Sequence, residues 1–245
     1  MFDAAVVIPV YNHGVTAVRM VQAVRQLGLK CIVVDDGSDA QCAATLAIIG
    51  TQPGVHRLRL AENQGKGGAV MAGLRLALER GHTHAVQIDA DGQHDPNDIP
   101  AFLALARAQP DAVICGCPVY DASVPRGRLI GRYLTHVWVW INTLSLDIRD
   151  SMCGFRVYPL ASVVALIDSE PIGQRMDFDT EVLVRLHWRG VKVVNRPTRV
   201  TYPVDGISHF RMWRDNVLIS RMHTRLFFGM ARRLPMLLWR RVRAA

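Results

Sequence analysis

Segments with the residue pattern of buried strands alternate along the chain with segments whose apolar residues recur at helical spacing. Short runs rich in valine, isoleucine and alanine are typical of buried strands, and they lie at residues 4–10, 31–34, 56–60, 85–88 and 112–115, with one or two more within 191–202. Apolar residues recur at helical spacing over residues 15–27, 67–80 and 99–108. Strands that alternate with helices predict an α/β fold, a mostly parallel sheet with helices on both faces.

The strict alternation ends after about residue 118. A long and largely helical segment follows, with a loop around residues 150–156, before the last strands. Residues 133–146 are uncharged but fall short of the ~20 residues that a membrane span needs, so this segment is not expected to cross a bilayer. The five scattered cysteines form no CxxC pair, which favours small core residues in a reducing compartment over a zinc or redox site.

Positive charge is concentrated at the carboxyl-terminal end. Residues 211–245 hold nine arginines and one aspartate, which accounts for the whole net charge of +8. These arginines alternate with large apolar side chains, as in amphipathic helices that lie in a membrane interface, with a break expected near Pro235. We therefore expect a catalytic domain over residues 1–210 and a basic membrane-associating tail over residues 211–245, with anionic lipid as its partner.

Two other partners for the tail stay open. A basic helix can dock on the surface of its own protein, and a basic arm can bind nucleic acid. The large apolar residues of the tail argue against nucleic acid, because an arm that follows phosphates does not need them. The chain opens with Met1-Phe2-Asp3 and no basic segment before its first strand, so we expect a cytoplasmic protein, peripheral on the inner face of the membrane.

Polar clusters follow the first four predicted strands. They are Pro9-Val10-Tyr11-Asn12, Asp35-Asp36-Gly37-Ser38, Asn63-Gln64-Gly65-Lys66-Gly67-Gly68 and Asp89-Ala90-Asp91-Gly92-Gln93. In open parallel sheets, ligands bind beyond the carboxyl ends of the strands. Four clusters at the same edge therefore predict a binding site there.

The third cluster is glycine-rich but matches neither common phosphate loop. Gly67 follows Lys66 where a Walker loop needs serine or threonine, and Val70 stands where a dinucleotide fingerprint needs its third glycine. What remains is a glycine-rich entry to a helix, whose amide groups and Lys66 can face a phosphate or ribose. A plain turn with a solvated lysine is the alternative.

The fourth cluster carries a metal-binding pattern. Asp89 and Asp91 are separated by one residue at a strand end, so in an extended backbone both carboxylates point the same way. They can share one hard divalent cation, Mg²⁺ or Mn²⁺, which would neutralise the charge that builds on a departing diphosphate. Aspartates also occur in ordinary turns, so the pattern alone is weak.

These residues carry a resemblance to a known family. The segments VIPVYN, VVDDGS, ENQGKGGAV, DADGQHDP, DSMCGFR and FDTEVLVRLHWRG stand in the order found in glycosyltransferase family 2. Over roughly residues 4–210 the chain resembles this group of GT-A (Rossmann-like) enzymes, which includes polyprenyl-phosphate sugar synthases. The resemblance implies a metal-dependent enzyme that moves a sugar from a UDP or GDP sugar to a lipid or lipid-linked acceptor with inversion of the anomeric carbon.

The resemblance also implies roles for single positions. The expected nucleotide-sugar site draws on all four clusters and comprises Pro9, Tyr11, Asn12, Asp36, Lys66, Asp89, Ala90 and Asp91. The metal would be held by Asp89 and Asp91, with Gln93 as a third ligand. Asp179 occupies the position of the general base, a role that contributes roughly 10² to 10⁴ in rate. Without the resemblance, Asp179 reads as an acid that complements a helix dipole.

The acceptor region departs from the family pattern. Polyprenyl-phosphate sugar synthases tend to carry arginines where this chain has Pro118 and Pro203, so the usual phosphate clamp is incomplete. The arginines expected to compensate are Arg126, Arg132 and Arg156, with Arg128. An ionised phosphate needs no base, so Asp179 and the two prolines together tilt the prediction slightly toward a lipid hydroxyl as the acceptor.

Two other functions stay open. A sugar nucleotidyltransferase also presents carboxylates to a metal and a nucleotide, although PVYN replaces the glycine-rich, basic triphosphate loop that such an enzyme needs. A non-catalytic adaptor that binds nucleotide sugars or membranes is the third class, and the presence of Asp89, Asp91 and Asp179 argues against it.

Overall fold

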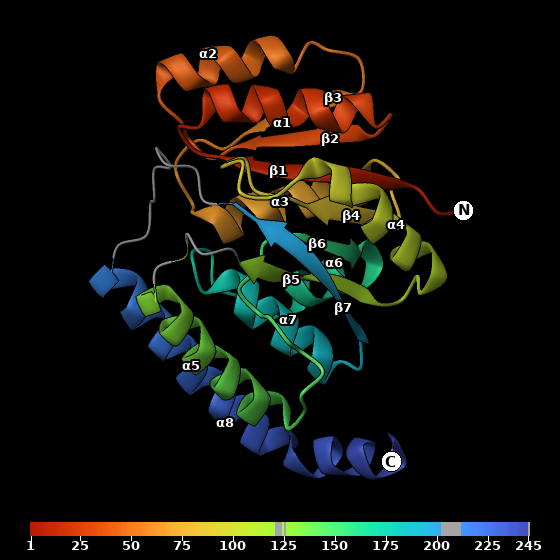
Figure 1. Cartoon of the computed structure of the whole chain (residues 1–245), viewed down its shortest axis with the longest axis vertical. Helices are drawn as coiled ribbons and strands as arrows, with labels where there is room; N and C mark the ends of the chain where they lie inside the picture. Colours follow the sequence, from red (N-terminus) through yellow and green to blue (C-terminus); the bar gives the residue numbers. More distant parts are fainter. Residues whose placement is uncertain (121–123, 125, 202–211, 245) are drawn as a thin grey trace.

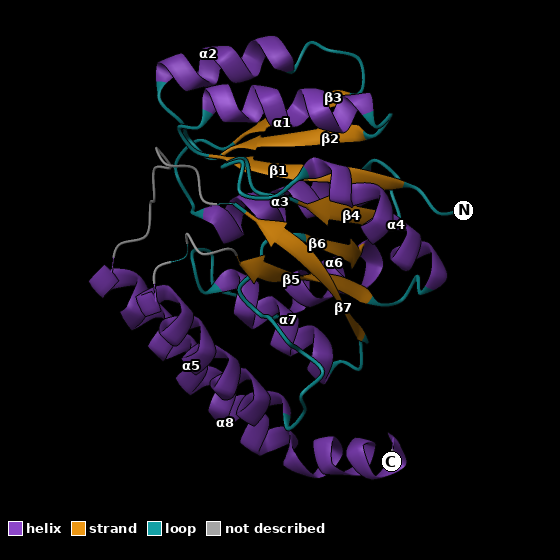
Figure 2. Cartoon of the chain, in the orientation of Figure 1, coloured by secondary structure: helices purple, strands orange, loops and turns teal. Residues whose placement is uncertain are grey.

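The computed structural model describes residues 1–120, 124, 126–201 and 212–244. Its elements are β1 (Ala4–Val10), α1 (Gly14–Gln26), β2 (Lys30–Asp35), α2 (Ala40–Ile49), β3 (Val55–Arg59), α3 (Lys66–Glu79), β4 (His84–Gln87), the 3₁₀ turn η1 (Pro96–Asp98), α4 (Ile99–Ala108), β5 (Val113–Tyr120), α5 (Arg126–Thr143), β6 (Arg156–Pro159), α6 (Leu160–Ser169), α7 (Phe178–Trp188), β7 (Val193–Val200) and α8 (Met212–Ala244). Figure 1 shows their arrangement, and Figure 2 shows helices on both sides of the sheet.

The strands form one seven-stranded sheet in the order β3-β2-β1-β4-β6-β5-β7. Within the described part of the chain, β6 alone runs antiparallel to its neighbours, β4 and β5. The parallel strands β1, β2, β3 and β4 therefore end at the same edge, which brings together the loops that follow them. This arrangement confirms the predicted α/β fold with a mostly parallel sheet.

Side chains of the central strands alternate between two buried cores. In β1, Ala5 and Val7 face one core with α3, α6 and α7, whereas Val6 and Ile8 face the other with α1, α2 and α4. This period of two follows from the pleat of a strand. Burial on both faces explains why the strand sequences are continuous apolar runs.

The structure confirms most of the elements expected from the sequence and adds helix α2 and strand β6. Strand β1 and helix α4 have the predicted bounds, whereas β5 continues to Tyr120, five residues beyond its predicted end. Helix α2 was not predicted, although Asp39 caps it by accepting a hydrogen bond from the Cys42 amide. Strand β6 begins at Arg156, where a loop was expected, and residues 191–202 contain one strand, β7.

The described part of the basic tail forms a single helix, α8, that packs on the rest of the chain. Met222, Leu226, Met230 and Leu237 of α8 are buried in the core that also contains α5 and α7. Pro235 lies inside α8, which bends toward its carboxyl end but does not break (Figure 2). The buried face of α8 therefore docks on the protein's own surface, which is one of the alternatives that the sequence left open.

Truncation of one buried residue of α8 should reveal this packing. Leu226 is buried, so we expect Leu226→Ala to lower the free energy of unfolding by about 3 kcal/mol, from lost burial and a cavity. Phe228 on the same helix is exposed, and Phe228→Ala is expected to change it by less than about 0.5 kcal/mol. Urea unfolding measures both values, and equal stability of the two variants would mean that α8 does not dock as described.

Candidate active site at the carboxyl ends of the strands

Hydrogen bonds tie the loops after β1 and β2 together. Asn12 adopts a left-handed backbone conformation with φ of 58°, and its amide donates to the Ser38 hydroxyl. Its side-chain oxygen accepts from the Asp39 amide at 2.9 Å. Pro9 pairs with Val34 inside the sheet, and Tyr11 follows at the strand end. The structure thus brings the first two predicted clusters side by side.

Asp36 organises the glycine-rich loop before α3. Its carboxylate accepts hydrogen bonds from the amides of Gln64 and Gly65 and from the Asn63 side chain, at 2.8–2.9 Å. Gly65 has a φ of 92°, which favours glycine and lets its amide turn back toward Asp36. Both oxygens of Asp36 are therefore engaged, so in this arrangement the residue shapes the loop that leads to Lys66.

Lys66 connects the predicted metal site with Asp179. Its ammonium lies 2.7 Å from Asp89 Oδ2 and 2.8 Å from Asp179 Oδ2, and its side chain is 19% exposed. Burial opposes the charged form of Lys66, but the two carboxylates outweigh it and raise the pKa of the ammonium above its usual value. Lys66 was predicted to face a phosphate or ribose, and in the structure its ammonium lies between two carboxylates.

The loop of the DSMCGFR segment closes over this cluster. A Cβ atom added to Gly154 would lie 2.5 Å from Lys66 Nζ and 2.6 Å from Asp89 Oδ2, so no larger residue fits without moving them. The glycine thus permits the loop backbone to approach the charged groups closely. The sequence gave no reason to expect this contact beyond the resemblance of the whole segment.

Asp89 keeps one carboxylate oxygen unengaged by the described residues, beside Asp91. Asp89 Oδ1 is buried without a hydrogen-bond partner among the described residues, so an acceptor faces the site unused. Burial and the neighbouring charge of Asp89 raise the pKa of Asp91 to about 6, because two carboxylates this close resist joint ionisation. The Gln93 amide donates to Asp91 Oδ1 at 3.0 Å, which folds the turn back toward the pair. The described residues contain no cluster of three or more acidic, histidine or cysteine ligands, so an amide or the substrate would complete the shell.

Asp179 lies in the first turn of α7 with both carboxylate oxygens engaged. Oδ1 accepts from the Gln87 side-chain amide at 3.0 Å, and Oδ2 pairs with Lys66. Burial opposes ionisation, but the charges of Lys66 and Arg156 outweigh it and lower the pKa of Asp179. A carboxylate held in this way is a weak proton acceptor, so the environment does not favour the predicted role as general base.

Arg156 is not at an acceptor site, which corrects that prediction. Its side chain is fully buried, and its guanidinium donates to the backbone oxygens of Asp179 and Ser151 and to the Tyr158 hydroxyl. Arg156 is the first residue of β6, and its hydrogen bond to the Asp179 backbone oxygen directs its side chain toward α7. The residue supports the start of α7 and cannot reach a bound lipid phosphate.

Arg132 of α5 lies beside the carboxylate cluster. A small pocket of about 70 Å³ is lined by residues that include Asp89, Gln93, Pro118, Tyr120 and Arg132. The Nε and Nη2 atoms of Arg132 donate to Asp150, and no hydrogen bond joins Nη1 to another of the described residues. The side chains of Arg126 and Arg128, and all of Pro203, lie outside the described residues.

Asp150 orders both Arg132 and the loop after it. Its carboxylate accepts the Arg132 fork at 2.5 and 2.6 Å, lies 3.3 Å from His136 Nε2, and accepts from the amides of Met152 and Cys153. Burial opposes ionisation, but the hydrogen bond from His136 and the charge of Arg132 hold the pKa of Asp150 well below its usual range. Sequence reasoning did not single out Asp150.

His94 is a second residue of this pocket that the sequence did not identify. Its ring is buried beside Cys153 and Phe155, and Nδ1 has no hydrogen-bond partner among the described residues. Burial lowers the pKa of His94 to about 4, so the ring is neutral at pH 7. A lone histidine in a turn is usually solvated, and only the fold reveals that this one lines the pocket.

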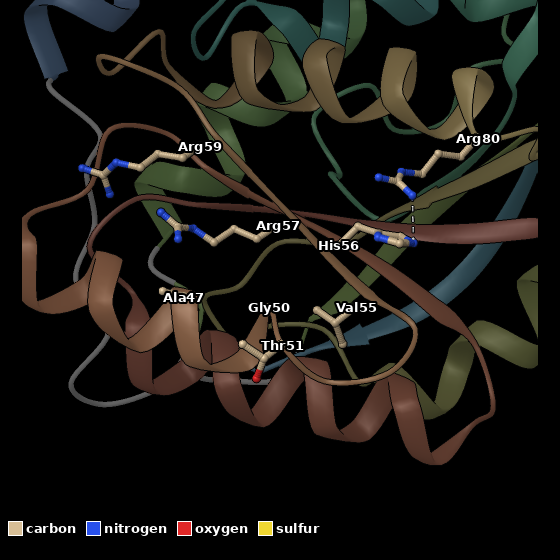
Figure 3. A pocket seen from close by; sticks show the side chains of 8 residues that line it. All are labelled: Ala47, Gly50, Thr51, Val55, His56, Arg57, Arg59 and Arg80. Atoms are coloured by element: carbon tan, nitrogen blue, oxygen red, sulfur yellow. Dashed lines mark hydrogen bonds between the residues drawn. The ribbon is translucent and has the colours of Figure 1, made fainter.

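A larger hollow lies beside β3, the outermost strand on one side of the sheet, and does not belong to this site. It has a volume of about 500 Å³ and is lined by Arg57, Arg59, Arg80 and His56, among others (Figure 3). Arg57 and Arg59 pair with Asp35, and Arg80 contacts His56. The hollow surrounds the edge strand β3 rather than the strand ends that carry Asp89 and Asp91.

The chain is similar in sequence to known sugar transferases. The family model described as glycosyl transferase family 2 matches residues 5–164. The undecaprenyl-phosphate mannosyltransferase of Micrococcus luteus is 31% identical over 206 residues, covering 78% of this chain and 80% of that protein. The polyprenol monophosphomannose synthase of Mycolicibacterium smegmatis is 28% identical, covering 83% and 79%.

The fold also resembles that of a solved enzyme. Glucosyl-3-phosphoglycerate synthase from Mycobacterium tuberculosis, in complex with Mn²⁺ and UDP-glucose, superposes with a TM-score of 0.69 over 94% of this chain and 79% of that chain. The two sequences are 15% identical, so this likeness concerns the fold alone.

The Asp150 pair should make stability depend on pH. Because its pKa is depressed in the folded state, ionised Asp150 stabilises the fold above its unfolded pKa of about 4, and this contribution is lost as pH falls toward the folded pKa. We expect Asp150→Asn to lower the free energy of unfolding by about 3 kcal/mol at neutral pH. Urea unfolding at pH 7 and at pH 3 should show that the difference from wild type shrinks in acid.

Asp168 offers a matched control, since its pair with Arg75 is exposed. Asp168→Asn should have little effect at either pH. A loss in Asp150→Asn that is the same at both pH values would contradict the assigned ion pair.

Proposed function

Because the chain belongs to glycosyl transferase family 2, we propose that it moves a sugar from a nucleotide diphosphate sugar to a polyprenyl phosphate at a membrane surface. The observation that carries this proposal is that Asp89, whose charge acts on Asp91, lines one pocket together with Arg132. The carboxylates suit a metal-bound diphosphate, and the arginine suits a second phosphate. The relatives named for undecaprenyl phosphate and polyprenol support this acceptor class.

Asp89 and Asp91, with Gln93, would hold Mg²⁺ or Mn²⁺. Two observations support such a cation: Asp89 Oδ1 has no hydrogen-bond partner among the described residues, and burial together with the charge of Asp89 raises the pKa of Asp91. When bound, a divalent cation neutralises the negative charge of the diphosphate and improves it as a leaving group. Lys66 adds a second positive charge at the same position. The loops that carry Pro9, Tyr11, Asn12, Asp36 and Ala90 would surround the nucleotide.

A phosphate acceptor fits the environment of Asp179 better than a hydroxyl acceptor does. Both oxygens of Asp179 are bound, and its lowered pKa makes it a poor base. An ionised phosphate oxygen needs no deprotonation before it attacks. Asp179 would instead fix Lys66 in place, and the slight preference for a hydroxyl drawn from the sequence is reversed.

The proposed transfer is a single displacement. An ionised oxygen of the acceptor phosphate, held by Arg132, attacks the anomeric carbon of the sugar and forms the new C–O bond. The bond from that carbon to the nucleotide diphosphate breaks, its electron pair leaves with the diphosphate oxygen, and the configuration inverts. Arg132 stabilises the acceptor charge, and Lys66 stabilises the charge on the leaving group.

A membrane location suits a polyprenyl acceptor. Helix α8 exposes arginines and large apolar side chains in addition to its buried face, a combination that suits anionic lipid. The protein would lie peripherally on the inner face of the membrane, where nucleotide sugars are available. Removal of residues 211–245 is a poor test of this anchor, because it would uncover the core contacts of α8.

Transfer assays with paired acceptors test the proposed function. Labelled UDP-glucose and GDP-mannose are supplied with Mn²⁺ and either undecaprenyl phosphate or undecaprenol. We expect label on the phosphate from one donor and none on the alcohol. Transfer to the alcohol alone would contradict the phosphate acceptor. Release of pyrophosphate from a sugar phosphate and a nucleoside triphosphate would indicate a nucleotidyltransferase. Inactivity toward all donors would indicate a non-catalytic adaptor.

The metal site is tested by Asp91→Asn. We expect turnover to fall more than roughly a hundredfold, because the variant loses one anionic ligand, while far-UV circular dichroism stays unchanged. Asp95 lies in the same loop and caps the next turn, so Asp95→Asn is the control and should keep most of the activity. Full activity of Asp91→Asn would remove the metal assignment.

The acceptor role of Arg132 is tested by a change that keeps its charge. Arg132→Lys loses the forked geometry, so we expect KM for the prenyl phosphate to rise by about tenfold while KM for the donor is unchanged. Arg75→Lys, at an exposed pair on α3, serves as the control. An equal rise in both KM values would show that the change acts on the whole site and not on the acceptor.

A further inference from the structure

Helix α5 has its polar side inward and its apolar side outward. Within residues 129–143, the exposed side chains are Leu129, Ile130, Tyr133, Leu134, Trp138 and Ile141, none of which is charged. The polar residues Arg132 and His136 turn inward to Asp150, and Asn142 contacts His223. A helix at a water surface shows the reverse pattern, so this outer face is suited to an apolar partner.

Helix α8 continues this face and borders it with arginines. Its exposed apolar residues include Phe227, Phe228, Leu238 and Trp239. Arg221, Phe228, Arg232, Trp239 and Arg243 recur at spacings of seven and four, so they form one stripe along the helix. The Arg243 guanidinium lies 3.9 Å from the centre of the Trp239 ring, which confirms that these two neighbours share a side.

The two helices form one surface. Figure 1 shows α5 and α8 side by side at the margin of the molecule, and Trp138 of α5 stacks on His223 of α8 at 6.0 Å between ring centres. Trp138 itself is 44% exposed, so it belongs to this surface as much as to the helix contact. Among the described residues, no helix is both long and apolar enough to cross a membrane.

The charges favour a lipid surface over a second copy of the chain. A two-fold contact through this face would bring equivalent arginine stripes near each other, which is unfavourable. An anionic bilayer instead offers phosphates to the arginines and acyl chains to the apolar side chains. Aromatic residues with one polar end, such as Tyr133, Trp138 and Trp239, are also typical of the membrane interface.

We propose that the outer face of α5, together with the exposed stripe of α8, lies in the headgroup region of an anionic bilayer. Arg132 lies between exposed Ile130 and Tyr133 in sequence and lines the pocket beside Asp89 from the inner side of α5. One helix therefore contacts lipid on one side and the pocket on the other. The acceptor role of that pocket rests on the proposed function, whereas lipid contact by α5 does not.

Vesicle sedimentation of the full chain tests this surface. Ile130 and Leu134 are 64% and 58% exposed, so Ile130→Glu/Leu134→Glu should fold normally, which circular dichroism checks. We expect the binding of this double variant to vesicles of phosphatidylglycerol and phosphatidylcholine to fall by roughly tenfold or more, since two exposed apolar side chains become charged. Ile48 of α2 is 70% exposed and far from this surface in sequence and fold, and Ile48→Glu is the matched control. If the double glutamate variant misfolds, Ile130→Gln/Leu134→Gln replaces it.

Unchanged vesicle binding by a folded α5 variant would overturn the proposal. The proposal would also be overturned if the α5 variant lost a dimer that light scattering detects in wild type but still bound vesicles. The face would then be the contact with a second copy of the chain. Transfer to a water-soluble, short-chain prenyl phosphate separates this inference from the proposed function. The α5 variant should transfer to it as well as wild type does. If wild type transfers no sugar but the α5 variant loses vesicle binding, the proposed function fails and the lipid surface stands.

Discussion

The ammonium group of Lys66 lies between the carboxylates of Asp89 and Asp179, and three elements meet at this point. Lys66 opens α3, Asp89 follows β4, and Asp179 lies in the first turn of α7. Two mostly buried carboxylates without a cation between them would repel each other and resist ionisation. The lysine therefore fixes how the amino-terminal strands and α7 approach, and the backbone of Gly154 packs closely against the contact.

The halves of the chain contribute different chemistry to this cluster. The loops after β1 to β4 hold one another through Asn12 and Asp36 and present Asp89 and Asp91. The later segments bring Arg132 from α5 and the Asp150 loop to the same pocket. The proposed donor side and the proposed acceptor side thus meet at Asp89, and α5 extends from the proposed acceptor side to the proposed lipid surface.

The sequence predicts those elements whose apolar residues recur at the spacing of a strand or a helix. The apolar run of β1 and the periodicity of α4 identified both elements with correct bounds. Strand β6 has four residues and runs antiparallel, so its formation depends on partners distant in sequence, β4 and β5. Helix α2 is apolar on nearly all sides, with Ile48 exposed, and so lacks the one-sided pattern by which helices are recognised.

The candidate site shows the same division. Asp89 and Asp91 were found because their spacing and strand-end position carry chemical meaning, but the partners of Asp179 were not, since Gln87 and Lys66 are remote in sequence. Arg156 was assigned to the acceptor because sequence does not show burial. Asp150 was overlooked because its role depends on ion pairs with Arg132 and His136 of α5, and the sequence does not show these contacts.

A thermal-shift measurement of the full chain tests the central claim most directly, namely that Asp89, Asp91 and Lys66 form a metal-dependent site for a nucleotide diphosphate. UDP, GDP and their common sugar conjugates are each added with and without Mn²⁺. The structure predicts that one nucleotide series raises the Tm in the presence of Mn²⁺ and has much less effect without it. No stabilisation by any nucleotide, or equal stabilisation with and without the metal, would contradict this account.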